Sequence, residues 1–123
     1  MKREYKLFLK DIVKACEYIQ EFVEGIDFDQ FLKDEKTSSA VIQKFGIIGE
    51  AVKNIPEFIK QKYPDIAWKD MAGMRDRLIH GYFGVDYVLV WDTIESDIPE
   101  IISSISQILD HLEKEQNVGY LSI

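Results

Sequence analysis

The segment 91-WDTIESDIPEIISSISQILDHL-112 decides the fold class, because its apolar residues recur at alternating intervals of three and four. This spacing places them on one face of an α-helix. Two earlier segments carry the same pattern. The three apolar stripes are Tyr5, Leu9, Ile12, Cys16, Ile19, Val23 and Ile26; Val41, Phe45, Ile48, Val52, Ile55 and Ile59; and Trp91, Ile94, Ile98, Ile101, Ile105, Ile108 and Leu112. They predict three helices that each bury one face.

The connections between the stripes predict the rest of the topology. The segment 25–30 contains Gly25 and the letters DFDQ, and we expect it to be a loosely ordered connection after the first helix. Asp34 is expected to cap the second helix. A turn is expected at 63–65, followed by a shorter helix from about Trp68 to Ile79. Pro99 is expected to divide or kink the last helix.

We therefore predict an all-α fold, an antiparallel four- to five-helix up-and-down bundle. Its single domain is expected to span 1–116, followed by a C-terminal tail at 117–123.

Composition narrows the class of protein. The chain has 123 residues with 15 basic and 22 acidic side chains, a net charge of −7, which argues against a broad positive surface for nucleic acid. The negative net charge is compatible with a local basic cleft and with docking against a basic partner. No apolar run reaches the length of a bilayer-spanning helix or of a signal peptide. With a single cysteine, Cys16, expected in the core, these features predict a cytoplasmic protein.

Two glycines, Gly46 and Gly49, fall inside the second expected helix. Each costs a helix about 1 kcal/mol relative to alanine, so their presence needs a reason. Close approach of a neighbouring helix, in the same chain or in a dimer partner, is the favoured interpretation, and a ligand contact is the alternative. A phosphate loop is excluded because the glycine spacing and the lysine–serine pair are missing.

The segment 73-GMRDRLIHGYF-83 concentrates titratable chemistry at the end of the short helix. Histidine transfers protons near neutral pH, and arginine stays charged and matches the geometry of phosphate. Arg75 and His80 lie about 140° apart on an ideal helix, whereas Arg77 and His80 lie about 60° apart. Arg75 and His80 therefore converge only if the helix ends near His80 or if a second subunit contributes.

The other residues of this segment leave several roles open. Asp76 can orient the histidine or pair with an arginine, and Arg77 can bind phosphate or pair with Asp76. Tyr82 is available for hydrogen bonding, base stacking or covalent modification. A purely structural alternative is a helix-end histidine near the carbonyl dipole beside surface Arg–Asp pairs.

Two long stretches carry a family resemblance: 31-FLKDEKTSSAVIQKFGIIGEAVKNIP-56 and 65-DIAWKDMAGMRDRLIHGYFGVDYVLVWDTIESDIPEI-101. Together they closely resemble the HepT-like branch of the HEPN superfamily, with Ala67 where a proline is common. The family motif R-x4-H-x-Y corresponds here to Arg75, His80 and Tyr82.

The resemblance implies a metal-independent ribonuclease toxin of a toxin–antitoxin system, which needs no cofactor. It implies a homodimer with both motifs in one cleft, Arg75 and His80 as the catalytic pair, and Asp76 in support; Arg77 lies outside the minimal motif. The implied partners are substrate RNA and a minimal nucleotidyltransferase antitoxin, which in some systems transfers AMP to the tyrosine matched by Tyr82. Such an adduct would repel RNA phosphate.

Two other functions compete with this one. The chain can be a non-catalytic dimeric module that docks a nucleotidyltransferase and presents Tyr82 as its substrate, or a structural helical dimer. Outside the motif, we expect His111 and the acidic run at 92–100 to be solvated, Trp68 and Trp91 to be packing anchors, and no metal site.

Overall fold

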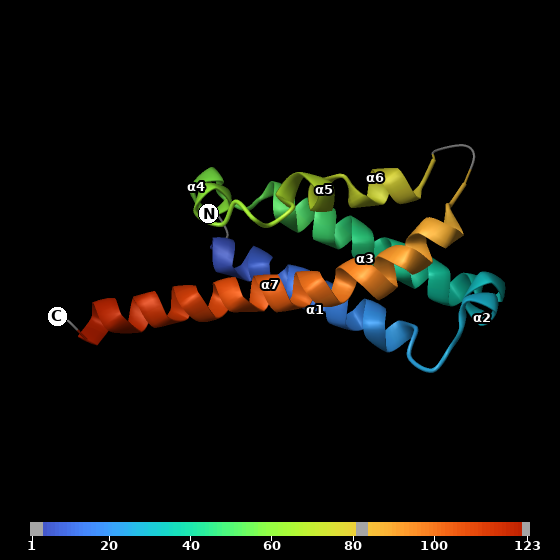
Figure 1. Ribbon diagram of the computed structural model, residues 1–123, viewed down its shortest axis with the longest axis horizontal. Helices are drawn as coiled ribbons and strands as arrows, with labels where there is room; N and C mark the ends of the chain where they lie inside the picture. Colours follow the sequence, from blue (N-terminus) through green and yellow to red (C-terminus); the bar gives the residue numbers. More distant parts are fainter. Residues whose placement is uncertain (1–3, 81–83, 122–123) are drawn as a thin grey trace.

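The computed structural model describes the backbone of residues 4–80 and 84–121 and the side chains as far as Glu115 (Figure 1). Within these ranges the chain is helical apart from its connections and one isolated β-bridge, which confirms the predicted all-α class. The helices are α1 (Tyr5–Phe22), α2 (Phe28–Lys33), α3 (Glu35–Lys53), α4 (Glu57–Lys62), α5 (Trp68–Ala72), α6 (Met74–Leu78) and α7 (Tyr87–Leu121).

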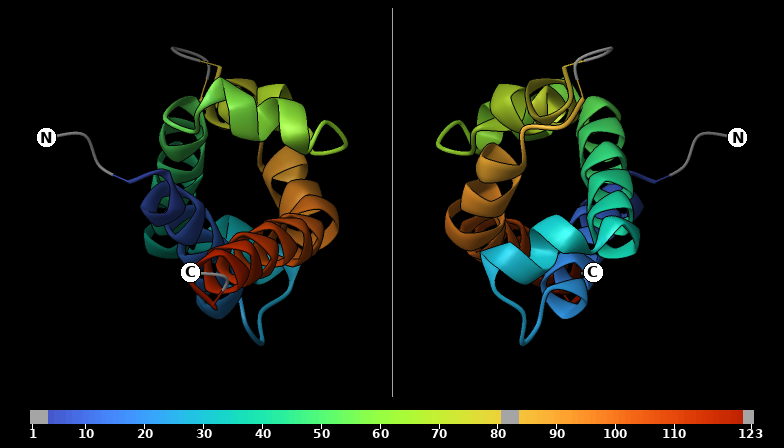
Figure 2. Two further views of the ribbon diagram at one scale, coloured as in Figure 1. Left: turned by 90° about the vertical axis from the view of Figure 1, so that its left-hand side faces the viewer. Right: turned by 90° about the vertical axis from the view of Figure 1, so that its right-hand side faces the viewer.

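The long helices α1, α3 and α7 and the consecutive pair α5–α6 form an antiparallel bundle of four members. Their directions alternate along the chain in Figure 1, and the end-on views of Figure 2 show them arranged in a ring. Helix α1 packs against both α3 and α7, and α5 and α6 pack on α3. The pair α5–α6 therefore occupies the fourth position of the bundle, where the sequence predicted one shorter helix.

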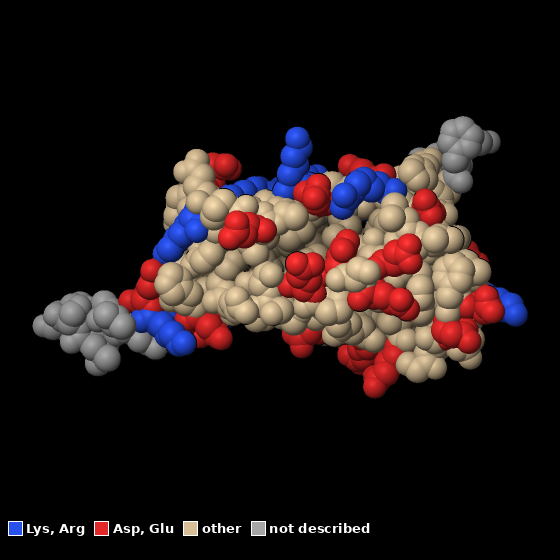
Figure 3. All heavy atoms as spheres, viewed as in Figure 1, with Lys and Arg blue, Asp and Glu red and all other residues tan. Residues whose placement is uncertain are grey.

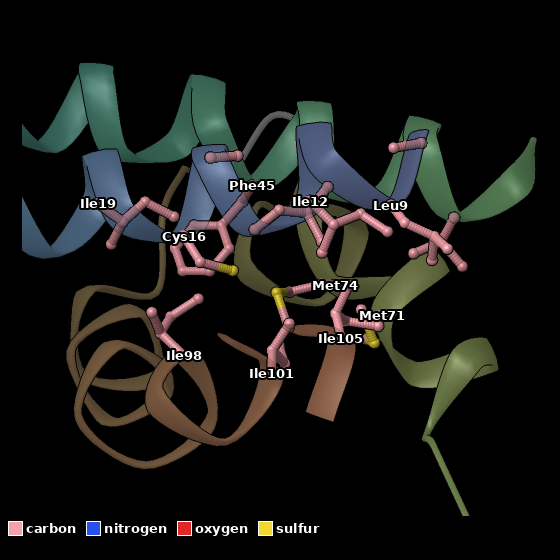
Figure 4. Close-up of a cluster of buried hydrophobic side chains, with 14 of the residues drawn as sticks. Leu9, Ile12, Cys16, Ile19, Phe45, Met71, Met74, Ile98, Ile101 and Ile105 are labelled. Carbon is pink, nitrogen blue, oxygen red and sulfur yellow. The ribbon is translucent and has the colours of Figure 1, made fainter. Parts of the chain in front are cut away.

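Side chains from all four members meet in one core (Figure 4). Phe45 is fully buried between apolar side chains of α1 and α7, and Met71 and Met74 enter the core from α5 and α6. Cys16 is buried in the same core, and this burial raises the pKa of its thiol to about 12, so it is a packing residue as expected. The buried stripes agree with the predicted ones.

Helix α2 is an element that the sequence interpretation did not include. Asp27 accepts a hydrogen bond from the backbone N–H of Gln30, and the Gln30 side chain accepts one from the N–H of Asp27, which forms a capping box. Phe31 is fully buried and lies 5.2 Å from the ring of Trp91. The cap and this aromatic contact order a segment that was expected to be loose.

Two helix breaks differ from expectation. The predicted helix from Trp68 to Ile79 is interrupted at Gly73, a poor helix former, yet its apolar stripe stays buried on both sides. Pro99, in contrast, lies inside α7, which continues as a single helix of 35 residues. The predicted division at Pro99 is therefore absent, and the axis of α7 curves along its length in the end-on views of Figure 2.

The continuous helix α7 extends to Leu121, into the segment expected to be a tail. Across the described part of the chain, no helix is both long enough and apolar enough to cross a membrane.

The predicted cap at Asp34 is confirmed and generates a pH-dependence. Its side chain accepts hydrogen bonds from the Oγ1 and the backbone N–H of Thr37, and these bonds hold the pKa of Asp34 below its usual 3.8. A lowered folded-state pKa contributes stability above pH 3.8 that is lost as the pH falls through the folded value. Asp34→Ala is therefore expected to lower the urea midpoint near neutral pH, and the difference from wild type is expected to shrink near pH 3.

Asp34→Asn is the matched control, because the amide can still accept from the Thr37 N–H without titrating. Its urea midpoint should lie between those of the other two proteins near neutral pH. A difference between wild type and Asp34→Ala that is constant from pH 7 to pH 3 would contradict this role.

Candidate active site

The position of the candidate site is set by a close contact between α3 and α5. A Cβ added to Gly49 would lie 3.0 Å from the carbonyl oxygen of Ala72 and 3.6 Å from that of Met71. The first distance is tighter than most real Cβ contacts, so a larger residue fits here only if the α5 backbone moves by a few tenths of an ångström. The predicted close approach at Gly49 is confirmed, and the neighbouring helix belongs to the same chain.

Gly46, one helical turn earlier, faces the side chain of Arg75. A Cβ at Gly46 would lie 3.3 Å from Cδ and 3.7 Å from Nε of Arg75. The aliphatic stem of the arginine therefore passes directly over the glycine. The glycine pair was visible in the sequence, but nothing there linked it to Arg75, and only the fold brings the two together.

His80 lies outside the helix that carries Arg75. Helix α6 ends at Leu78, and Ile79 is extended, with φ −120° and ψ 118°. The backbone N–H of His80 donates to the carbonyl of Gly84 at 2.9 Å, and Ile79 forms an antiparallel bridge with Val85. The ending of the helix meets one of the two conditions under which the sequence allowed Arg75 and His80 to converge.

Gly84 allows the chain to return to α7. Its φ of +93° lies in the left-handed region, which residues other than glycine adopt only at a cost in free energy. The Asp86 N–H then donates to the carbonyl of Leu78 at 2.9 Å, which ties the start of α7 to the end of α6. The backbone on both sides of 81–83 is thus held by hydrogen bonds. Tyr82, the predicted modification site, lies outside the described residues.

Arg77 pairs with Asp70, not with Asp76 as one sequence interpretation proposed. Its Nη1 lies 3.8 Å from an Asp70 carboxylate oxygen, and its Nη2 donates to the Asp70 carbonyl at 2.9 Å. Both side chains are more than half exposed, so the ion pair contributes little to stability. It also leaves some N–H donors of the Arg77 guanidinium available to another partner. Asp76 is exposed and forms no ion pair among the described residues.

The four predicted site residues Arg75, Asp76, Arg77 and His80 are all exposed. Figure 3 shows Lys and Arg side chains along the edge of the molecule formed by α5 and α6, and many Asp and Glu side chains over the face formed by α7. On this edge Lys69, Arg75 and Arg77 alternate with Asp70 and Asp76, whereas carboxylates predominate over the face formed by α7. This edge is accessible to a large anionic substrate.

A hollow of about 200 Å³ lies beside this edge, between α5, α6 and α7. Its lining includes Met71, Met74 and Arg77, together with several carboxylates, but neither Arg75 nor His80. The hollow adjoins the candidate site through Arg77, but its carboxylates repel phosphate, so it is a poor place for a phosphate group. In the described part of the chain, no three His, Cys, Asp or Glu side chains lie close enough together to hold a metal ion.

His111, the other histidine, lies far along α7 and is exposed, as predicted for a solvated helix residue. Its ring contacts the hydroxyl of Tyr63 and the carboxylate of Glu115. Trp68 is buried and donates from its indole N–H to the Tyr63 carbonyl at 2.9 Å, which confirms its packing role.

Comparison with known proteins identifies the family. Residues 12–108 match the family described as "Ribonuclease HepT-like". The chain belongs to the HepT-like ribonuclease family. The matched range includes Arg75, His80 and Tyr82, so the site described above lies within the HepT-like region.

Several relatives share most of the HepT-like chain. It is 52% identical over 101 residues to "Probable ribonuclease HepT" of Thermococcus cleftensis, covering 82% of this chain and 92% of that protein. It is 45% identical over 114 residues to "Putative RNase MJ0127" of Methanocaldococcus jannaschii, covering 93% and 94%, and 46% identical over 114 residues to "Putative RNase MJ0125" of that organism, covering 93% and 98%. No solved structure gives a significant match.

The two glycines with positive φ provide a prediction about the loop that holds His80. Gly84→Ala and Gly25→Ala each place an L side chain in the left-handed region, at φ of +93° and +78°, with no atom within 4 Å of the new Cβ. Each is expected to lower the free energy of unfolding by about 1 kcal/mol, measured by urea denaturation. Only Gly84→Ala is expected to change the amide chemical shift of His80 in NMR spectra.

Gly25→Ala is the matched control, because Gly25 follows α1, at a distance in sequence from the site. An unchanged His80 amide signal in Gly84→Ala would show that the hydrogen bond to Gly84 does not define the position of His80.

Proposed function

We propose that this chain is a metal-independent endoribonuclease that cleaves RNA with Arg75 and His80. The observation that carries the proposal is the end of α6 at Leu78, which releases His80 from the helix that presents Arg75 and leaves both side chains exposed. Membership of the HepT-like family and the ribonuclease names of its relatives support the same activity.

The chemistry follows from the two side chains. In RNA, the 2′-oxygen attacks the adjacent phosphorus while the bond to the 5′-oxygen breaks, which gives a cyclic phosphate and a free 5′-hydroxyl. His80 takes the proton from the 2′-hydroxyl or gives one to the leaving oxygen. Arg75 stabilises the negative charge that develops on the phosphate oxygens.

The single motif histidine of each chain, His80, serves one of these proton transfers at a time. We propose that two copies of the chain form a homodimer whose motifs line one cleft, so that the second His80 serves the other transfer. Doubling Arg75 and Arg77, with help from Lys69 or Lys53, would also supply the local positive charge that an acidic chain needs to hold RNA.

We further propose a toxin–antitoxin role, in which a minimal nucleotidyltransferase is the antitoxin and AMP transfer to Tyr82 is the off-switch. Tyr82 follows His80 by two residues, so a phosphate on its phenol oxygen would add negative charge beside the catalytic pair. That charge would repel the RNA backbone. Asp76, next to Arg75, would support the arginine or bias the histidine.

The first test is cleavage of a mixed RNA substrate by the purified protein in EDTA. Arg75→Ala and His80→Ala are each expected to lower the single-turnover rate by at least about 100-fold, because each removes a group that acts in the transition state. The same RNA with 2′-deoxy sugars should remain intact. His111→Ala is the control, since that histidine is exposed on α7 away from the motif.

Intact mass must first show that Tyr82 is unmodified in the preparation. Cleavage by folded Arg75→Ala or His80→Ala at the wild-type rate would contradict the assignment. Absence of cleavage by an unmodified, dimeric wild type would favour the alternative, a non-catalytic module that docks a nucleotidyltransferase and presents Tyr82.

A second test concerns the off-switch. Wild type incubated with a candidate nucleotidyltransferase and ATP is expected to gain an adenylyl group and lose cleavage. Tyr82→Phe should cleave RNA at close to the wild-type rate and stay active after the same treatment. Inactivation of Tyr82→Phe, with an adenylyl group found elsewhere by peptide mass spectrometry, would assign the switch to another residue.

A further inference from the structure

Gly46 has a place in the site that its residue type alone does not suggest. We propose that Gly46 is a positioning residue for Arg75: its lack of a side chain sets the path of the arginine stem and so the location of the guanidinium. This inference rests on the proposed function, because it assigns Gly46 a part in phosphate binding through Arg75.

The geometry separates Gly46 from an ordinary helix-packing glycine. The atoms within 4 Å of a Cβ at Gly46 are Cδ and Nε of Arg75, both from one side chain, and no backbone atom is among them. At Gly49 the nearest atoms are backbone atoms of Ala72 and Met71. Gly49 therefore allows the helices to pack, whereas Gly46 makes room only for the arginine.

The path of Arg75 depends on this contact. Arg75 is exposed and forms no ion pair among the described residues, and its stem lies against Gly46. A methyl group at 3.3 Å from Cδ is tighter than most such contacts, and a flexible side chain relieves it by rotating. Such a rotation moves the guanidinium, beyond Cδ, away from its original place.

The same geometry predicts opposite effects on stability and activity. Gly46 lies in the interior of α3, where alanine is a better helix former than glycine, and no backbone stands in its way. Gly46→Ala should therefore raise the melting temperature. Its cleavage rate should fall by up to about 10-fold, because the contact displaces the arginine stem by a few tenths of an ångström, whereas a misplacement of about 1 Å can cost about 100-fold.

The experiment compares Gly46→Ala with Gly49→Ala, each alone and with Arg75→Ala. Gly49→Ala should lower the melting temperature, because its Cβ meets the Ala72 carbonyl. Gly46→Ala should lower the rate of RNA cleavage in the wild-type background and leave the residual rate of Arg75→Ala unchanged. A solely structural role would give no such dependence on Arg75.

The NMR signal of the Arg75 Nε–H group, assigned by its absence in Arg75→Ala, is a readout that needs no activity. It should shift in Gly46→Ala and not in His111→Ala. A Gly46→Ala protein that cleaves RNA at the wild-type rate, or that leaves the Nε–H signal in place, would overturn the inference. If the wild type proves inactive, the proposed function fails, while the Nε–H signal still decides whether Gly46 positions Arg75.

Discussion

The close contact between α3 and α5 at Gly49 is the constraint on which the site depends. Because Gly49 has no side chain, the carbonyl oxygen of Ala72 lies only 3.0 Å from the position a Cβ would take, and α5 packs directly on α3. Helix α6 follows α5 after Gly73, so the same contact also sets the position of α6, the helix that carries Arg75. One helical turn away, Gly46 receives the stem of Arg75. The core beneath is filled by Met71 and Met74, which hold both short helices against the bundle.

The distribution of charge reconciles an acidic chain with an anionic substrate. The net charge of −7 is spread so that carboxylates cover much of the α7 face, while Lys and Arg side chains lie along the edge formed by α5 and α6 (Figure 3). Arg77 is tied to Asp70, whereas Arg75 is left without such a partner among the described residues. An arginine that is not neutralised is the better phosphate ligand, because no ion pair must break before it binds.

Much of this fold is predictable from the sequence, because the spacing of apolar residues alone locates α1, α3 and α7, and Asp34 marks a helix start. Where the structure differs from the prediction, the cause is local: the capping box of Asp27 and Gln30 creates α2, and Gly73 divides the predicted fourth helix into α5 and α6. The motif residues could be selected from chemistry and resemblance. The sequence could not predict that Gly46 faces Arg75 or that Arg77 pairs with Asp70, because both contacts depend on how α5 and α6 pack on α3.

Arg75 and His80 are proposed to act as one catalytic unit on RNA. This proposal is tested most directly by the single-turnover cleavage rate of the double variant Arg75→Ala/His80→Ala beside the two single variants, each shown to be folded. Groups that act as a unit give non-additive losses, so the double variant should be slowed about as much as the more damaging single variant. Losses that multiply, with the double variant far slower than either single variant, would show that the two residues act independently and would contradict the account.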